Sequence, residues 1–494
     1  MKSLSDFWID TFLEPFGSKQ AAPTTITFPD AARGRHTFLL GGIGAGKSRF
    51  IEGLVVQDVV RRLTDKSGRG VGVIDVHGDL YENLRARLAL VALRLPELSR
   101  ILYLLDPTLP NWTIKYNPLE LRPGELPERK ADLLASIVTA VFQDDPTIVT
   151  RMRWLLWHAF LTLILAELPL ASILPLLRDS EFRERVVSGL GHPELTGYWL
   201  TEFPGKQREG MAWAESSLDR MGRFLTNPYI APLLQGPSTI DFRQLMDTGA
   251  TILINASKGH IGEDASYLLC AFLLAEFQQA ALSRVDTPFN QRTPFALMAD
   301  EFANYGNDTV RQIVEESRKF GLELLLAGQG LGQIRDERLR SSLLNSVGNV
   351  LSFRLGYEDA EILVKSLFTP ALDQTKPPAS YNGNYSWRSL AEIWEAEIRK
   401  LSELPDRTLW WKRKGQPGSY RIEAFPIKDV EDLPEYNRLP QALFLQEQGA
   451  YRLAGVPRVR VEQPSSHQSS QDNNPPKVIY LPPPVDDEDS IWSL

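Results

Sequence analysis

The chain has 494 residues, of which 43% are hydrophobic and 23% are charged, and it contains one cysteine, Cys270. This composition is ordinary for a soluble globular protein and excludes a fibrous or wholly disordered chain. A single cysteine excludes an intramolecular disulfide and a cysteine-based zinc site. The formal net charge of −8 argues against a protein that coats DNA through a globally basic surface. Part of this acidic excess lies after Gln463, which leaves room for a local basic groove or pore.

Residues 1–117 begin with a short amphipathic segment and then alternate strands with helices. The segment 1–30 carries acidic residues within its apolar stretch, which makes it a poor signal peptide. Buried strands are predicted at 36–40, 70–76 and 101–105, with helical periodicity after the first of them. Strand–helix–strand order of this kind predicts a parallel sheet for residues 31–117.

The pattern changes in residues 118–245, where helical periodicity dominates and strand signals vanish, which predicts an all-α insertion. Within it, the apolar stretch 154–177 has the composition of a membrane span. Its uninterrupted part is shorter than the roughly 20 residues that a bilayer requires. The interrupting residues are His158, Glu167, Pro169 and Pro175. We interpret the stretch as two buried helices joined at Pro169 and expect no intrinsic membrane span.

Strands return in residues 246–430, which complete the α/β core. The expected strands are 251–255, 295–299, 322–327 and 349–353, and the expected helices lie near 264–284, 308–320 and 335–345. A hairpin is predicted where two β-type runs flank Gly415-Gln416-Pro417-Gly418. Residues 431–462 form a C-terminal extension. The Pro-rich, acidic tail 463–494 is too polar to compensate its ordering entropy and is predicted to be disordered.

A phosphate-binding motif follows the first predicted strand. The run Gly41-Gly42-Ile43-Gly44-Ala45-Gly46-Lys47-Ser48 satisfies G-x-x-x-x-G-K-[ST] and lies between a strand and a helix, as this motif requires. Its glycines let backbone N–H groups surround a β-phosphate at a helix N-terminus. Lys47 is expected to neutralise the β/γ oxygens, and the Ser48 hydroxyl is expected to bind Mg²⁺. The motif predicts an ATP and Mg²⁺ site in a RecA-like P-loop NTPase core; a chance match in a glycine-rich turn is the weaker alternative.

Two acids end the predicted strand 295–299. The apolar run delivers Asp300 to the carboxyl edge of the sheet, where ligands bind in open α/β sheets, so Asp300 is expected to hold Mg²⁺. Glu301, the next residue, is placed to polarise the attacking water. The alternative is a helix N-terminus that favours acidic residues.

A third polar residue follows the predicted strand 322–327. Gln329, in Gly328-Gln329-Gly330, is expected at the same sheet edge, near the γ-phosphate, where its amide senses hydrolysis. An ordinary loop glutamine is the alternative reading of this position.

Further short motifs lie along residues 30–430. They are Arg35-His36, VIDVHGDL at 73–80, YNPL at 116–119, ADEF at 299–302, SRKFG at 317–321 and GQGLGQ at 328–333. Together they resemble the HerA/FtsK superfamily of ATPases, and within it the TraG/TraD-type coupling ATPases of conjugative DNA transfer. The all-α insertion and the run Asn255-Ala256-Ser257-Lys258-Gly259 are also similar to that group.

The resemblance implies a homohexameric ring that threads DNA through a central pore on ATP hydrolysis. In such relatives an arginine before the phosphate loop reaches the neighbouring subunit's site, and the matching residue here is Arg35. Arg354, after the strand 349–353, is a second candidate for this role, which stabilises charge on the transferring phosphoryl group. For each arginine a surface salt bridge remains the alternative. Asp75 is a candidate to assist Mg²⁺ or the arginine.

The sequence departs from the coupling-protein pattern at two places. Coupling proteins usually carry an N-terminal membrane anchor, and no such segment is apparent here, so we expect a cytoplasmic chain that is peripheral at the inner membrane only through a partner. The usual threonine before the central glycine of the phosphate loop is Ile43. That change should be tolerated because the position contributes its backbone.

A translocase should contact DNA phosphates without reading bases. The candidate pore residues are 304–311, Arg318, Lys319, Arg335, Arg338 and Arg340. Tyr305 is expected to stack on a base if the DNA is single-stranded. A solvated helix face is the alternative for each of these residues. The acidic, partly apolar end of the tail is either a docking peptide for a protein partner or a solubilising segment.

Three functions therefore stay open at the level of sequence. The first is an ATP-driven DNA translocase for conjugative or mobile-element transfer. The second is a HerA-like motor that works with a nuclease in DNA processing or defence. The third is a nucleotide-gated scaffold or secretion ATPase that acts on protein, in which case DNA should leave the turnover of ATP unchanged.

Overall fold

The computed structural model describes residues 30–65, 68–142, 146–208, 212–305, 308–334, 336–368, 390–416, 419–424, 427–458, 460–461 and 478–479. The predicted amphipathic start lies outside the described residues, apart from Asp30. So does the tail predicted to be disordered, apart from 478–479.

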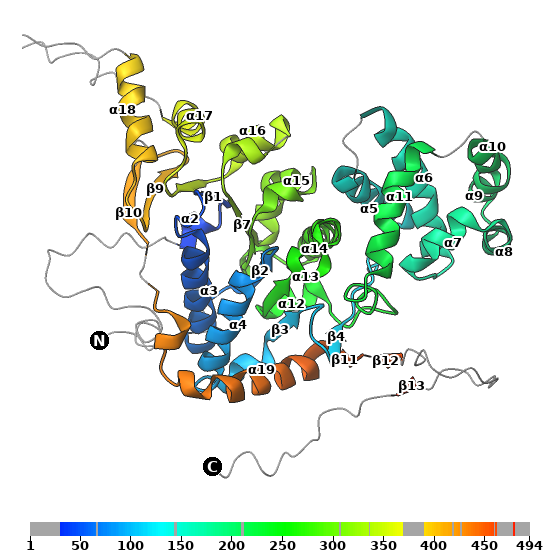
Figure 1. The fold of residues 1–494 in the computed structure, drawn as a ribbon, viewed down its shortest axis with the longest axis horizontal. Coiled ribbons are helices and arrows are strands. Elements are labelled where there is room, and N and C mark those ends of the chain that lie inside the picture. The colour runs from blue at the N-terminus through cyan, green and yellow to red at the C-terminus, as the bar shows by residue number, and fades with distance from the viewer. Residues whose placement is uncertain are drawn as a thin grey trace, which may run out of the picture.

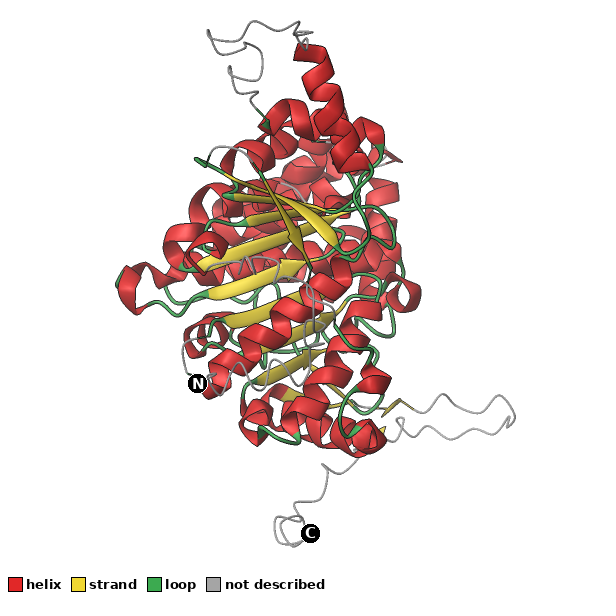
Figure 2. Cartoon of the chain, turned by 90° about the vertical axis from the view of Figure 1, so that its left-hand side faces the viewer, coloured by secondary structure: helices red, strands yellow, loops and turns green. Residues whose placement is uncertain are grey.

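A mainly parallel sheet forms the centre of the described chain (Figure 2). It has nine strands in the order β10-β9-β8-β1-β7-β6-β2-β5-β3. Its parallel strands are β8 (Asn349–Ser352), β1 (Thr37–Leu40), β7 (Leu322–Gly328), β6 (Phe295–Ala299), β2 (Gly70–Asp75), β5 (Thr251–Asn255) and β3 (Leu102–Leu105). The hairpin of β9 (Thr408–Arg413) and β10 (Tyr420–Glu423) adds an antiparallel edge. The predicted parallel α/β sheet and its terminal hairpin are confirmed.

The apolar composition of the central strands explains why both faces of the sheet are covered. Every residue of β1, β2, β5 and β6 is buried. Strands with continuous apolar runs belong in parallel sheets with helices on each side.

Chain direction decides which helix covers which face, because parallel strands are joined by right-handed crossovers. The steps from β1 to β2 and from β2 to β3 run one way across the sheet, and the steps from β5 back to β8 run the other way. One face therefore carries α3 (Lys47–Thr64) and α4 (Asp79–Ala92), against which α19 (Leu439–Ala454) packs (Figure 1). The opposite face carries α12 (Phe242–Thr248), α14 (Glu263–Ser283), α15 (Asp308–Glu316) and α16 (Glu337–Ser346).

Between β4 (Trp112–Ile114) and α12 the described chain forms helices joined by loops and contains no strand, and Figure 1 shows these helices grouped at one end of the molecule. They are α5 (Pro127–Phe142), α6 (Pro146–Leu165), α7 (Ile173–Arg178), α8 (Ser180–Leu190), α9 (Pro193–Gly197), α10 (Phe203–Arg208) and α11 (Ala212–Thr226). The break between α6 and α7 contains Pro169 and the left-handed residue Glu167. The prediction of two helices joined at Pro169 is therefore confirmed.

The helix α14 is a core helix between the sheet and the helical insertion. In the described part of the chain one segment, Glu263–Asp286, is long and apolar enough to cross a membrane, and 78% of its most apolar window is buried in this fold. It packs against α5, α11, α12 and α15. Cys270 lies on this helix, fully buried, as its apolar surroundings predict.

Several short or late elements were not anticipated. The strand β4 pairs with β11 (Gly455–Pro457), which lies far later in the sequence, and α19 packs on α4 and β3. The other unanticipated elements are α2 (Asp30–Arg33), α13 (Lys258–Ile261), α17 (Tyr357–Leu367), α18 (Leu390–Ser402), β12 (Arg460–Val461) and β13 (Val478–Ile479). Within the predicted C-terminal extension 431–462, the helix α19 thus lies against the core.

Candidate nucleotide site

The phosphate loop joins the carboxyl end of β1 to the first turn of α3. Gly44 and Gly46 have φ values of 73° and 111°, a region that residues with a Cβ rarely adopt. A Cβ at Gly41 would lie 2.8 Å from Cβ of Phe353. The loop is also tied to the strand ends on either side, since the N–H of Gly41 donates to the carbonyl of Gly328 and that of Gly42 to the carbonyl of Arg354. These constraints explain the glycines of the motif.

Lys47 lies over this loop. Its side chain is 8% exposed, and its Nζ donates to the carbonyl oxygen of Gly41 at 2.7 Å and approaches that of Gly42 at 3.4 Å. Ser48 follows it on α3 and is half-buried. The ammonium and the α3 N-terminus together place positive charge where a phosphate is expected. Ile43, at the tip of the loop, is 87% exposed.

Asp300 and Glu301 follow β6 at the same edge of the sheet, and both side chains are buried. Burial, followed by the charges of Asp75 and Glu301, raises the pKa of Asp300 to about 7, and the charge of Lys47 opposes this shift. Glu301 has φ 48°, the left-handed region that non-glycine residues avoid. Strained backbone and crowded carboxylates are typical of functional sites.

The structure brings Gln329 to Glu301. Its Nε2 donates to Oε1 of Glu301 at 2.9 Å, and Gln333 extends the chain with a 3.4 Å contact to Gln329 Oε1. The strand order causes this meeting, because β7 lies between β1 and β6. The residue that follows β7 therefore falls between the phosphate loop and the two acids.

Asp75 ends β2, and its carboxylate holds the turn into α4. It accepts N–H groups of His77, Gly78 and Tyr81 at 2.8 to 2.9 Å. Its charge also contributes to the raised pKa of Asp300. The geometry thus gives Asp75 a turn-holding role, and its assistance to Mg²⁺ stays a prediction.

The two candidate arginines lie at opposite edges of the sheet. Arg354 follows β8 beside the phosphate loop, and its guanidinium forms a 3.0 Å ion pair with Asp406. Arg35 is exposed and precedes β1, so the strand separates it from its own phosphate loop by about 13 Å. A role for Arg35 in catalysis therefore requires the site of a second chain.

The expectation that Tyr305 stacks on a nucleic-acid base is wrong. Its side chain is 2% exposed, and its hydroxyl donates to the carbonyl of Asp300 at 2.7 Å. The ring lies near Tyr267. Tyr305 therefore supports the strand end that carries the two acids.

The predicted basic lining is divided between the two edges of the sheet. Arg338 is exposed at the start of α16, near the carboxyl edge. Arg318 and Lys319 are exposed in a turn just before β7, at the amino edge. Arg340 pairs with Glu337 at 3.4 Å. Arg335 lies outside the described residues.

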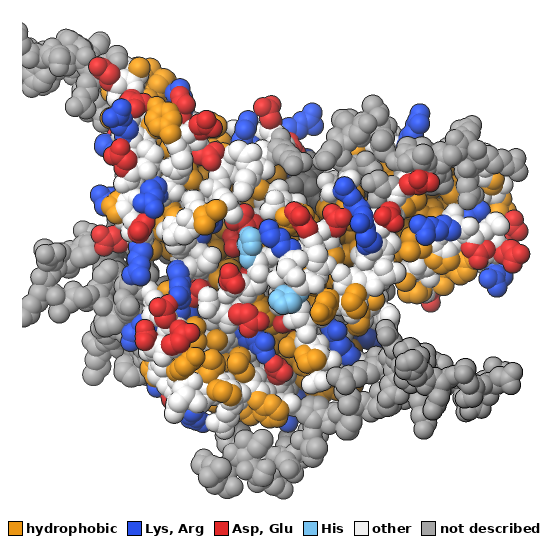
Figure 3. Space-filling model, viewed as in Figure 1, with side chains coloured by type: hydrophobic (Ala, Val, Ile, Leu, Met, Phe, Trp, Pro, Cys, Tyr) orange, Lys and Arg blue, Asp and Glu red, His pale blue; other side chains and the backbone are white. Residues whose placement is uncertain are grey.

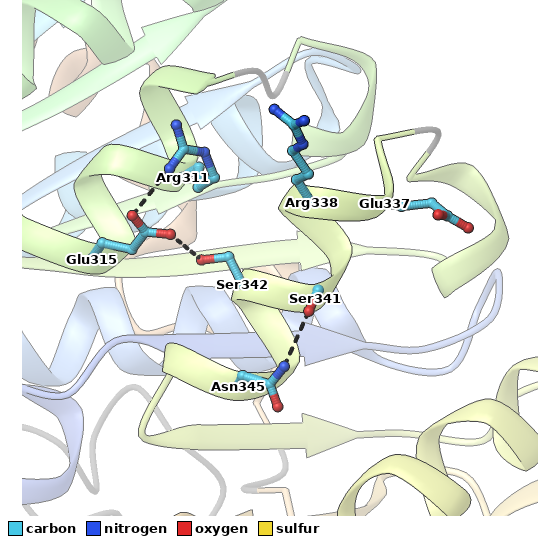
Figure 4. Close-up of a pocket in the computed structure, with 7 residues that line it drawn as sticks. All are labelled: Arg311, Glu315, Glu337, Arg338, Ser341, Ser342 and Asn345. Atoms are coloured by element: carbon cyan, nitrogen blue, oxygen red, sulfur yellow. Dashed lines mark hydrogen bonds and ion pairs between the residues drawn. The ribbon is translucent and has the colours of Figure 1, made fainter.

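A polar groove of about 590 Å³ runs between α15 and α16 (Figure 4). Glu315 crosses it, accepting from Arg311 at 3.1 Å and from the Ser342 hydroxyl at 3.0 Å. The lining residues are Arg311, Glu315, Glu337, Arg338, Ser341, Ser342 and Asn345. Its acids offset its arginines, and acidic and basic side chains also intermingle over the face seen in Figure 3.

The residues at the carboxyl edge fit a nucleoside triphosphate and Mg²⁺. A hydroxyl from Ser48 and a carboxylate from Asp300 are the oxygen ligands that Mg²⁺ prefers. Burial and the charges of Asp75 and Glu301 raise the pKa of Asp300, and a bound divalent cation would favour its charged form.

Comparison with known proteins finds solved structures of similar fold. No protein-family model matches the sequence, and no curated protein matches it. Plasmid coupling protein TrwB in complex with the GTP analogue GDPNP is similar, with a TM-score of 0.51 and 14% identity over 88% of this chain and 95% of that chain. TrwB in complex with ADP and Mg²⁺ has a TM-score of 0.50 and 16% identity over 87% of this chain and 94% of that chain. This chain has the P-loop fold of these coupling proteins, which confirms the predicted fold class.

Proposed function

We propose that the chain is an ATPase that moves DNA as a ring oligomer, in conjugative or mobile-element transfer. The observation that carries the proposal is the meeting of Lys47, Asp300, Glu301 and Gln329 at one edge of a sheet whose fold is that of plasmid coupling proteins. Each of these groups has a part in phosphoryl transfer, and the sheet edge is where such folds bind nucleotides.

Each side chain has a distinct task in the proposed hydrolysis. Bound ATP with Mg²⁺ supplies the phosphoryl group and the charge that activates it. Lys47 exchanges its loop carbonyls for phosphate oxygens, and Ser48 and Asp300 would hold the metal. Glu301 accepts the proton of the attacking water, which is a task for a carboxylate within hydrogen-bond reach. Gln329 holds Glu301 through its amide and is placed to respond when the γ-phosphate leaves.

The proposal also includes assembly into a ring and contact with DNA. The position of Arg35 supports a ring. This arginine lies at the sheet edge away from its own phosphate loop, so it could serve catalysis only in the site of a neighbouring subunit. DNA contact is supported by the exposed Arg318, Lys319 and Arg338, while the mixed charge of the surface argues for a few local phosphate contacts. Such contacts carry no sequence information, as a motor requires.

Steady-state ATP hydrolysis with and without single- and double-stranded DNA, from about 50 to 200 mM salt, tests the proposal. We expect DNA to stimulate turnover, and we expect the stimulation to fade as salt rises, because phosphate contacts release counterions. Lys47→Ala is the control for contaminating ATPases. Hydrolysis that ignores DNA at every salt concentration would overturn the translocase and favour a nucleotide-gated scaffold that acts on protein.

Mixed oligomers test the ring. Arg35→Ala subunits supply an intact phosphate loop, and Lys47→Ala subunits supply an intact arginine. If Arg35 acts in a neighbour's site, mixing the two inactive proteins should restore part of the activity. Absence of rescue at all mixing ratios, with assembly verified by light scattering, would remove Arg35 from the catalytic machinery.

A further inference from the structure

Asp359 lies in the first turn of α17 and bonds to a loop of another element. Its Oδ1 accepts the N–H of Leu331 and the N–H of Gly332, each at 3.1 Å. The carboxylate also occupies the space beside Gly330, where a Cβ would collide with it. Acidic residues are common in the first turn of a helix because of the helix dipole. Here, however, both of these hydrogen bonds join Asp359 to the neighbouring loop, and the N-cap residue of α17, Gly356, provides no side-chain cap.

The loop that Asp359 holds carries Gln329. Gln329 comes directly before Gly330, and its amide donates to Glu301 at 2.9 Å. The contacts therefore form a continuous series from the Asp359 carboxylate to the 330–332 backbone, to the Gln329 amide, and to the Glu301 carboxylate.

The segment leading into α17 also touches the phosphate loop. The carbonyl of Arg354, just before α17, accepts the N–H of Gly42 at 3.0 Å. The same short segment thus ties the loop that binds phosphate and, through Asp359, the loop that carries Gln329. The segment from Arg354 to Asp359 therefore fixes the distance between the phosphate loop and the loop that carries Gln329.

We propose that Asp359 is a positioning residue: by holding the 330–332 backbone it sets the Gln329 amide against Glu301 and so orients the base of the reaction. This inference rests on the proposed function, since it gives Asp359 a task in hydrolysis. Sequence reasoning offered no signal for it, because the two hydrogen-bonded segments belong to no shared motif.

The test compares Asp359→Ala with Asp359→Asn in DNA-free ATP hydrolysis and in nucleotide binding. Removing the acceptor should lower kcat about tenfold, a part of the 10²–10⁴-fold that a positioned base contributes. The Kd for a fluorescent ATP analogue should not change, because Lys47 and the phosphate loop are intact. Asp359→Asn keeps an acceptor oxygen and should restore most of the rate.

The matched control is Asp179→Ala. Asp179 also accepts two backbone N–H groups, from Glu181 at 3.0 Å and Phe182 at 3.1 Å, but it caps α8 in the helical insertion. Its kcat should equal that of the wild type. If Asp359→Ala does not fold, Gly330→Ala takes its place, because the added Cβ displaces the same carboxylate and predicts the same fall in kcat.

A double-mutant cycle separates positioning from general support. If Asp359 acts through Gln329, then Asp359→Ala should add nothing to the loss caused by Gln329→Ala. If the two losses in kcat multiply in the double mutant, the inference is overturned. It is also overturned if both Asp359→Ala and Gly330→Ala keep the wild-type kcat. In either case the wild type still hydrolyses ATP, so the proposed function stands. A wild type that hydrolyses no ATP would instead overturn the proposed function.

Discussion

Buried charged groups lie at both edges of the central sheet, but their partners differ. At the amino edge, Arg33 donates to both oxygens of Asp58, one of them at 2.7 Å, and Arg69 forms a 2.7 Å ion pair with Glu323. At the carboxyl edge, burial and the charges of Asp75 and Glu301 raise the pKa of Asp300, and Lys47 is the charged group that opposes this shift.

The paired charges at the amino edge stabilise the fold, whereas we expect the crowded carboxylates at the carboxyl edge to take part in catalysis. A buried ion pair is strongly destabilised by loss of one partner, since the other is left buried and unpaired. Crowded carboxylates are themselves unfavourable, and such groups cluster at functional sites. The amino edge should therefore control stability, and the carboxyl edge should control activity.

Loss of Lys47 should have the largest effect and should separate the two edges most clearly. Lys47→Ala removes the ammonium over the phosphate loop and should lower the rate of ATP hydrolysis about 10²–10³-fold or more. The melting temperature should change little. The control is Lys400→Ala, an exposed lysine on α18, which should hydrolyse ATP at the wild-type rate.

Loss of Asp58 should mainly lower the stability of the fold, in contrast to loss of Lys47, which should mainly lower activity. Asp58→Ala leaves Arg33 buried without its carboxylate and should lower the free energy of unfolding by about 3–5 kcal/mol, measured by urea denaturation. Asp132→Ala breaks an exposed pair with Arg153 and should cost less than about 1 kcal/mol. Equal losses in the two variants would mean that burial does not set the value of the Asp58 pair.

The amino edge also predicts a pH dependence. Burial, reinforced by the charge of Arg318, lowers the pKa of His36 from 6.5 to about 4. Between these pH values His36 binds a proton in the unfolded chain but not in the folded protein. The free energy of unfolding should therefore fall as the pH falls from 6.5 towards 4. Over this pH range the protonation of His36 should lower the free energy of unfolding by about 3 kcal/mol.

Replacement of His36 isolates this contribution. His36→Asn keeps a polar side chain beside the Leu324 N–H, and asparagine tolerates the left-handed φ of 58°. The difference between the unfolding free energies of the two proteins should change by about 3 kcal/mol as the pH falls from 6.5 to 4, because only the wild type loses stability through His36. Parallel curves for the two proteins would show that His36 is not held neutral.

The smallest expected effect is a gain in stability at the carboxyl edge. Asp300→Asn removes one of the crowded carboxylates, so at pH 8, where Asp300 is charged in the folded protein, the free energy of unfolding should rise. Hydrolysis should be lost at the same time. A variant less stable than the wild type would mean that the Asp300 charge is compensated in the folded protein.

Much of the fold follows from local sequence because the core strands are continuous apolar runs. The strands Thr251–Asn255 and Phe295–Ala299 lie where the sequence predicts them. The phosphate loop has a motif whose glycines meet specific steric needs, and the acids after β6 follow from strand burial. The catalytic and metal-binding roles of these residues stay predictions.

What the sequence did not predict depends on contacts between distant segments. The strand β4 pairs with β11, and no local pattern marks three-residue strands so far apart. Tyr305 begins the run Tyr305-Gly306-Asn307-Asp308, a composition typical of exposed loops, yet its ring is buried beside Tyr267 and its hydroxyl has an internal acceptor. The tie from Asp359 to the Gln329 loop depends on how α17 packs, which sequence periodicity does not specify.

The most direct test of the account is the fate of ATP bound to Glu301→Gln in a single turnover, followed by quenching and separation of ATP from ADP. Glutamine has the shape of glutamate but cannot take the proton of the attacking water. The account predicts that this variant binds ATP as tightly as the wild type and retains it unhydrolysed. Formation of ADP at the wild-type rate would contradict the assignment of Glu301 and the claim that the carboxyl edge is the site of hydrolysis.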